Sequence, residues 1–246
     1  MSTTPLPLFY RQPRPLHPSR HGNRSLAARP DYRFAAGTNA VPLIAAELPV
    51  ACRHYPIVFT AGDQPYPVAV LGLRGKQNLF VDEAGNWKAD AYVPAYVRRY
   101  PFILMENEGA TEFTLCVDET AGAFMEGRDN PFFDADGKPT DIARNALAFC
   151  GDYQKQHTLT AEFAQALTSA GLLVDNRADV ALRNGEKLSL SGFRVIDEAR
   201  FAKLSDKEFK RWRTKGWLPL VYAHLISVGT WTTLIDRLGP PDHPAA

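Results

Sequence analysis

The sequence predicts an α+β fold: a predominantly antiparallel sheet packed by a long helical segment and a C-terminal helix. Three observations indicate this class. Short runs rich in aromatic and β-branched residues, separated by turn residues, fill residues 54–117. A long segment with an apolar stripe follows at Asp141–Ala170, and an apolar helix closes the chain at Trp217–Leu238. Strands joined by tight turns favour antiparallel pairing, and separate runs of strands and helices are typical of α+β proteins.

The first half of the chain is expected to form hairpins around a short helix. Ala61–Pro65 and Asp82–Gly85 carry the Gly, Asp and Pro residues that favour turns. Pro94 suits the first turn of a helix at Ala95–Tyr100, and Pro101 ends it. The expected strands are His54–Thr60, Val68–Leu73, Asn78–Val81, Phe102–Met105 and Phe113–Val117, with a turn at Asn107–Gly109 between the last two.

The second half is expected to hold the longest helix. Thr140 should cap this helix, and a kink or break is expected at Thr158–Thr160. Ser205, with Glu208 three residues later, predicts the start of a further helix. The expected helices are Asp141–Ala170, Asp197–Leu204, Asp206–Lys215 and Trp217–Leu238, and the expected strands are Leu172–Val174, Asp179–Leu182, Lys187–Leu190 and Phe193–Ile196.

The chain divides into an arm, a body and a tail. The N-terminal segment holds many prolines, which remove N–H donors, so it should be extended and ordered only where it lies on the body. Phe9 and Tyr10 are its expected anchors. The expected divisions are an arm at residues 1–35, a single α+β domain at 36–239 that allows two interdependent halves at 36–139 and 140–239, and a tail at 240–246.

Charge and composition argue against several partner classes. Lys and Arg number 28 against 27 Asp and Glu, and this net charge of +1 gives no argument for a nucleic-acid or membrane-surface partner. Cys52, Cys116 and Cys150 have no zinc-site spacing and are expected to be buried free thiols. Prolines and arginines interrupt the N-terminus where a signal peptide needs an apolar core, so a cytoplasmic location is expected.

One segment tests that expectation. Trp217–Ile235 carries no formal charge over a length close to the ~20 residues that span a bilayer. It also holds Pro219, His224, Ser227 and three threonines, which membrane insertion tolerates poorly. We therefore expect a buried helix and no membrane span.

The corner at Tyr96–Tyr100 offers the clearest candidate for ligand recognition. Arg98 and Arg99 lie about 100° apart on a helix, so only one of them can face a ligand squarely. That arginine could clamp a carboxylate or phosphate. The alternative is an internal ion pair that locks the corner. Its candidate acceptors are Asp82, Asp90, Asp118 and Asp197.

Other candidate side chains have a structural alternative too. Asp197 opens a helix and can cap it, whereas an acid–base role would need a second titrating partner. His224 lies in an apolar helix and is expected to bond to neighbouring carbonyls; it has no metal-ligand spacing with another histidine, so no metal is expected. The sequence contains no dinucleotide fingerprint, Walker loop or nucleophile elbow, so no cofactor is expected.

Several blocks of this sequence together resemble one bacterial family. The blocks are Tyr55–Phe59, Leu71–Leu73, Asn78–Asp82 with Gly85 and Trp87, Tyr92–Phe102, Phe193–Glu198 and Tyr222–Leu225. Together they are similar to the SapC family, named after a protein associated with a surface-layer locus, over most of residues 40–238. This is a different protein from the SapC permease of a peptide transporter, which has several membrane spans.

The resemblance implies no established catalytic mechanism. Genes of this kind often lie beside genes for flavin-dependent, tryptophan-halogenase-like enzymes and outer-membrane receptors. The leading hypothesis is a soluble accessory or small-molecule-sensing protein, with an aromatic and arginine-lined pocket between the sheet and the C-terminal helix. The alternatives are a component or partner of a flavin-dependent oxygenase or halogenase system, and a surface-layer or assembly protein. The expected partner is a small molecule or another protein. The candidate ligand-binding residues are Trp87, Tyr96, Arg98, Arg99, Arg194, Asp197, Tyr222 and His224.

Overall fold

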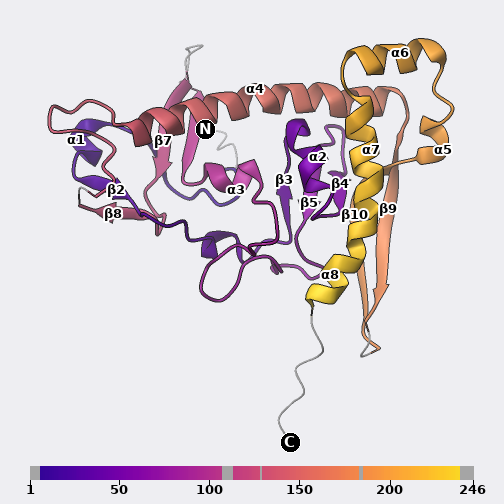
Figure 1. Ribbon diagram of the computed structural model, residues 1–246, viewed down its shortest axis with the longest axis horizontal. Coiled ribbons are helices and arrows are strands. Elements are labelled where there is room, and N and C mark those ends of the chain that lie inside the picture. Colours follow the sequence, from indigo (N-terminus) through magenta and orange to yellow (C-terminus); the bar gives the residue numbers. More distant parts are fainter. Residues whose placement is uncertain (1–5, 107–112, 128, 183–184, 239–246) are drawn as a thin grey trace, which may run out of the picture.

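A single long helix, α4 (Asp141–Ser169), runs along one side of the molecule and connects its two ends (Figure 1). The computed structural model describes residues 6–106, 113–127, 129–182 and 185–238. The fold is α+β, and within these residues the strands form three antiparallel sheets. The strands are β1 Pro13–Pro15, β2 Arg24–Leu26, β3 Ala40–Pro42, β4 Ile57–Thr60, β5 Pro67–Val70, β6 Phe102–Glu106, β7 Phe113–Asp118, β8 Phe124–Glu126, β9 Leu173–Ala181 and β10 Lys187–Ile196.

The remaining helices are short and flank the sheets (Figure 1). Their bounds are α1 Pro18–His21, α2 Leu48–Ala51, α3 Ala95–Arg99, α5 Glu198–Phe201, α6 Asp206–Thr214, α7 Leu218–Ser227 and α8 Trp231–Arg237, with 3-10 turns η1 Arg33–Ala35, η2 Ala45–Glu47 and η3 Val228–Thr230.

Helix α4 forms without the break expected at Thr158–Thr160. One face of the helix is buried, with Cys150, Tyr153, Phe163 and Leu167 recurring at helical spacing. Thr160 fits the helix because its hydroxyl donates to the Gln156 carbonyl at 2.6 Å, one turn earlier, and accepts from the Ala45 amide at 2.7 Å. The threonine therefore stays in the helix and ties it to η2.

The main sheet contains strands from both halves of the chain. Its order is β3-β5-β4-β10-β9, so β4 from the first half pairs directly with β10 from the second. Strands β6 and β7 lie in a separate three-stranded sheet with β1. The predicted antiparallel pairing is confirmed, and the arm supplies the second neighbour of β7.

The structure differs from two other strand predictions. Asn78–Val81 forms no strand, and Val81 makes only an isolated bridge to Trp87. The two strands expected between Leu172 and Leu182 are one strand, β9, which pairs with β10 along its length apart from an irregularity between Leu190 and Phe193. The turn expected at Asn107–Gly109 lies outside the described residues.

The N-terminal arm is anchored as expected. Strand β1 pairs with β7, and the ring of Phe9 packs against Tyr96 of α3 at a centroid distance of 5.7 Å. The buried hydroxyl of Tyr10 donates to the Phe102 carbonyl at 2.6 Å. The arm thus covers the sheet of β6 and β7 and brings Tyr10 towards α3.

The segment expected to form one C-terminal helix is divided into α7, η3 and α8, with Gly229 in the 3-10 turn. Leu218–Arg237 is long and apolar enough to cross a membrane by length and composition, with a mean hydropathy of 1.3, and 39% of that window is buried. Its inner face packs on the main sheet, whereas Ile226 is 64% exposed. The candidate ligand-binding residue Tyr222 is 48% exposed, because it lies on the outer face of α7.

The largest core cluster joins both halves of the chain. It contains Tyr55, Phe59 and Phe80 from the first half together with Phe163 and Trp212 from the second. The three cysteines are free and buried, as the sequence predicted. A shared core of this kind fixes α7 against the main sheet.

Candidate functional site

Arg99 lies buried at the end of α3, enclosed by three tyrosines. Its guanidinium carbon lies 4.4 Å from the ring centroid of Tyr153, 4.9 Å from that of Tyr96 and 5.6 Å from that of Tyr10. Only 8% of the residue is exposed. Burial would lower the pKa of Arg99, but the surrounding tyrosines outweigh it and hold the pKa above its usual value. The guanidinium is therefore a permanent buried cation.

Arg98 points the other way, to the surface. Its Nε donates to the Val93 carbonyl at 3.0 Å, and its Nη2 donates to the Tyr92 hydroxyl at 3.0 Å. The Tyr92 hydroxyl in turn donates to Glu47 at 2.8 Å. Arg98 thus closes the loop before α3, while its neighbour faces the interior, as the 100° step between them requires.

Neither arginine forms the ion pair that was considered as the structural alternative. Among the described residues, Asp90 pairs with Arg237, Asp197 pairs with Arg200, and Asp82 accepts from Asn86. Asp118 accepts from backbone amides and from the Thr120 hydroxyl at 2.6 Å. The corner is held by carbonyl and aromatic contacts instead.

His224 lies fully buried in α7 as a neutral imidazole. Its Nε2 accepts from the Ile196 amide at 3.0 Å, so the bond is to an N–H group and not to a carbonyl as expected. Burial lowers the pKa of His224 to about 4, and the nearby Ile57 backbone opposes part of that shift. The histidine therefore joins α7 to β10.

The other sequence-predicted residues have separate structural roles. Asp197 caps α5 by accepting from the Arg200 amide at 3.0 Å, which confirms the capping interpretation. Arg194 donates to Asp175 at 2.9 Å, on the neighbouring strand. The indole of Trp87 is buried and donates to the Tyr55 hydroxyl at 3.0 Å, whereas the half-exposed Tyr222 makes a T-shaped ring contact with Phe201.

These side chains do not converge on one pocket. In the described part of the chain, no hydrogen bond or ion pair connects Arg98 or Arg99 with His224. None of the predicted residues lines either of the two grooves described below. Their role in ligand binding stays a prediction.

The larger groove lies between α4 and the segment that runs from α5 to the start of α7. Its volume is about 1130 Å³. We call it the α4–α6 groove. The sequence did not indicate this groove, because it predicted only helices for α6 and its flanks and could not place Tyr66 beside them. Its aromatic wall consists of Tyr66, Trp212 and Trp217, and its basic residues are Arg200, Lys203, Arg211 and Lys215.

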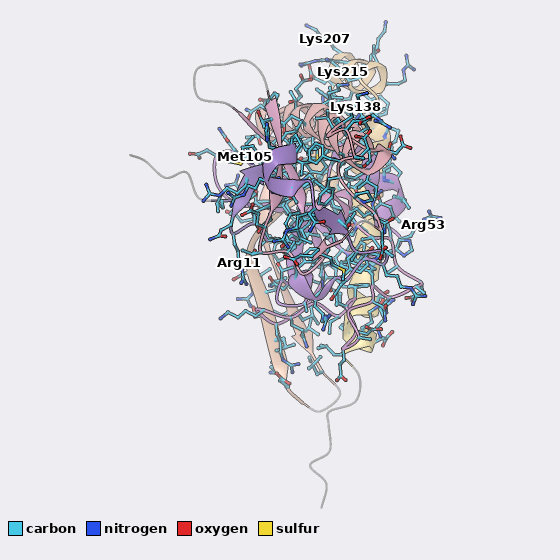
Figure 2. All side chains as sticks on the ribbon, turned by 90° about the vertical axis from the view of Figure 1, so that its left-hand side faces the viewer. Arg11, Arg53, Met105, Lys138, Lys207 and Lys215 are labelled. Carbon is cyan, nitrogen blue, oxygen red and sulfur yellow. The ribbon has the colours of Figure 1, made fainter. Side chains whose placement is uncertain are left out.

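The two arginines of this groove form ion pairs, whereas the two lysines form none within the described residues. Arg200 pairs with Asp197 at 3.3 Å and Arg211 with Glu208 at 3.5 Å. Within the residues described, no ion pair involves Lys203 or Lys215, and the ammonium of Lys215 lies 5.7 Å from the ring centroid of Trp217. Figure 2 shows Lys207 and Lys215 at the end of the molecule that α6 forms. Groups at 208, 211, 212 and 215 share one face of α6, and this helical spacing was the signal available in the sequence.

A second, smaller groove borders the arm. Its volume is about 620 Å³, and it is lined by Tyr10 and its neighbours, by Phe34 and by Tyr100. In the described residues, no group of three or more His, Cys, Asp or Glu side chains is placed to hold a metal ion.

Comparison with known proteins identifies the family. A family model described as SapC matches residues 16–234. The chain belongs to the SapC family. No curated protein and no solved structure matches the chain.

Three of the blocks that carry the SapC resemblance meet where the main sheet contacts α7. Tyr55–Phe59 overlaps β4, Phe193–Glu198 covers the end of β10 and the start of α5, and these two strands are neighbours in the main sheet. The Tyr222–Leu225 block places His224 against Ile196. These SapC blocks therefore build the junction between the two halves, while the α4–α6 groove lies to one side of it.

Proposed function

We propose that this SapC-family protein is a soluble, cytoplasmic accessory protein that binds a small anionic ligand with an aromatic or apolar body. The α4–α6 groove carries the proposal. A volume of about 1130 Å³ is sufficient for a ligand of drug-like size, since such pockets typically measure about 300–1,000 Å³. The groove also lies beside the C-terminal helix, although its main walls are α4 and α6.

The lining of the groove supports the ligand class. Tyr66, Trp212 and Trp217 offer aromatic surface, on which a planar or apolar body can pack. Lys203 and Lys215 supply positive charge that no described carboxylate neutralises in an ion pair. A ligand that carries a carboxylate or phosphate would complement these two lysines.

The proposal is tested by ligand titration of the full-length protein. The panel contains indole-3-acetate, octanoate and flavin mononucleotide, with indole-3-acetamide as the uncharged match for the first. Tryptophan fluorescence reports binding because two tryptophans line the groove. We expect saturable binding of at least one anion, and a weakening of at least about tenfold when Lys203→Glu and Lys215→Glu are combined, since even one lost charged contact corresponds to roughly 1.5–3 kcal/mol.

The charge control is Lys187→Glu, which makes the same change at an exposed position on β10 that does not line the groove. This variant should bind as the wild type does. Absence of saturable binding across the panel, or equal affinity of the double variant and the wild type, would contradict the proposal. If the protein prefers flavin mononucleotide, this result would favour a role as a component or partner of a flavin-dependent enzyme system.

A further inference from the structure

The outer face of α7 is apolar and exposed. The helix contains no Asp, Glu, Lys or Arg. Pro219, Tyr222 and Ile226 follow one another at three- and four-residue spacing, so they form one stripe along the surface of the helix. Ile226 is 64% exposed, and Val228 in the next turn is half-exposed. Exposed apolar side chains that gather in one stripe indicate a contact surface, whereas single ones are common on any protein.

Ring contacts extend this stripe onto α6. The ring of Phe201 lies between the two helices, at centroid distances of 5.7 Å from Tyr222 and 6.4 Å from Phe209. Phe201 is buried, whereas Phe209 is exposed. Figure 1 shows α6 at the N-terminal end of α7. The exposed side chains therefore form one apolar surface, which we call the α6–α7 face and which consists of Phe209, Tyr222, Ile226 and Val228.

Cations border this face on α6. Lys207, Lys210 and Arg213 are exposed, and Arg213 lies one turn after Phe209 on the helix. None of these three takes part in an ion pair within the described residues, whereas the acidic Glu208 is paired with Arg211. The net charge of the whole chain is only +1, so this positive charge is a local property of α6.

The inner face of α7 holds the helix on the main sheet. His224 accepts from the Ile196 amide of β10, and Ser227 accepts from the Ile57 amide of β4, both at 3.0 Å. A span across a bilayer would break these hydrogen bonds and expose the core beneath them. The apolar segment Leu218–Arg237, of which 39% is buried, is therefore suited to contact at a membrane surface and not to crossing.

We propose that the α6–α7 face binds the surface of an anionic lipid bilayer. The apolar side chains would enter the boundary between headgroups and acyl chains, where tyrosine is a favoured residue because its ring is apolar and its hydroxyl polar. Lys210 and Arg213 would then meet the lipid phosphates. These adjacent cations favour an anionic bilayer over an apolar protein surface, because a purely apolar partner would leave them without counter-charges.

The test is flotation of the full-length protein with lipid vesicles. One set contains phosphatidylglycerol and phosphatidylcholine in equal parts, and the other contains phosphatidylcholine alone. We expect the protein to float with the anionic vesicles and much less with the neutral ones. The bound fraction should fall as sodium chloride is raised, because salt screens exposed charges. The proposal does not depend on the ligand of the α4–α6 groove, since no residue of the α6–α7 face lines that groove.

Two variants separate the apolar and the charged contributions. Ile226→Glu should lower the partition coefficient onto anionic vesicles at least about tenfold, because it replaces an apolar contact by a negative charge. Its matched control is Leu147→Glu, the same kind of change at a half-exposed leucine of α4. The combined variant Lys210→Glu and Arg213→Glu should have an effect of at least about the same size.

The control for the charge variant is Arg29→Glu combined with Lys138→Glu, which changes the net charge equally at two exposed loop positions and should float as the wild type does. If Ile226→Glu fails to fold, the charge variant decides the question. Absence of flotation with anionic vesicles would overturn the proposal, as would equal flotation of each variant and its control. A dimer in sedimentation velocity that is lost in Ile226→Glu, without vesicle binding, would assign the face to a second copy of the chain instead.

Discussion

Two buried side chains, His224 and Arg99, differ in whether they keep their charge on burial. The imidazole of His224 is neutral and accepts from the Ile196 amide, so burial removes its charge. A guanidinium cannot be neutralised in this way, because its pKa lies far above physiological pH. Arg99 keeps its charge and is surrounded by tyrosines.

The state of His224 predicts a pH dependence of stability. The unfolded chain binds a proton on histidine near pH 6.5, whereas His224 in the folded protein does so only near pH 4. The stability that the neutral histidine contributes is therefore complete above pH 6.5 and is lost as the pH falls towards 4, by up to about 3 kcal/mol. His224→Gln should lose less stability over this window in urea denaturation.

Because other histidines also make stability depend on pH, the wild type has to be compared with the His224→Gln variant. Burial also lowers the pKa of His21, His54 and His157, so each of them adds acid sensitivity in the same direction. NMR titration of the His224 ring separates its contribution. A midpoint near 6.5 for that ring would contradict the prediction.

At the scale of secondary-structure elements, capping residues predicted where two helices begin. Only one of the two residues makes the expected capping hydrogen bond. Ser205 accepts from the Glu208 amide at 3.3 Å and caps α6 as predicted. Thr140 occupies the N-cap position of α4, yet its hydroxyl donates to the Pro131 carbonyl at 2.6 Å. The difference arises because the loop before α4 offers an acceptor that the sequence pattern does not reveal.

Ser205→Ala should weaken α6. The loss of an N-cap hydroxyl typically reduces stability by about 1 kcal/mol, and α6 also forms one wall of the groove. We therefore expect a lower thermal midpoint and weaker binding of groove ligands. The matched control is Ser189→Ala, which removes an exposed hydroxyl on β10 that does not line the groove. Equal stability of both variants would argue against the cap.

The whole molecule is held together where its two halves share a sheet and a core. Strand β4 pairs with β10, and Ser227 on α7 accepts from the Ile57 amide of β4 at 3.0 Å. The Ser227 hydroxyl also donates to the His224 carbonyl at 2.6 Å. Because these contacts link distant parts of the chain, neither half retains its packing if the other unfolds.

We expect one cooperative unfolding transition, with coincident midpoints by circular dichroism and tryptophan fluorescence. Ser227→Ala should lower the free energy of unfolding by about 1–3 kcal/mol, because the Ile57 amide is then left buried without an acceptor. The transition of this variant should remain single. Two separated transitions in the wild type would show that the halves unfold independently.

The sequence by itself determined local structure. Turn residues and apolar periodicity predicted α3, most of α4, the β6 and β7 strands and the cap of α6, since these depend on residues close in the chain. It also carried the SapC resemblance, which the family match established. Its candidate site grouped Arg99 with His224 on chemical type alone, and no local pattern could place Tyr153 or Tyr10 around the guanidinium.

Only the tertiary structure decided which strands share a sheet, which arginine is buried and where the grooves lie. Those outcomes depend on contacts between residues far apart in the chain, such as the pairing of Arg194 with Phe59 across the main sheet and the packing of Tyr10 and Tyr153 on Arg99. The burial of a side chain such as Arg99 depends on how helices and strands pack together, because its neighbours come from several segments that are distant in the sequence.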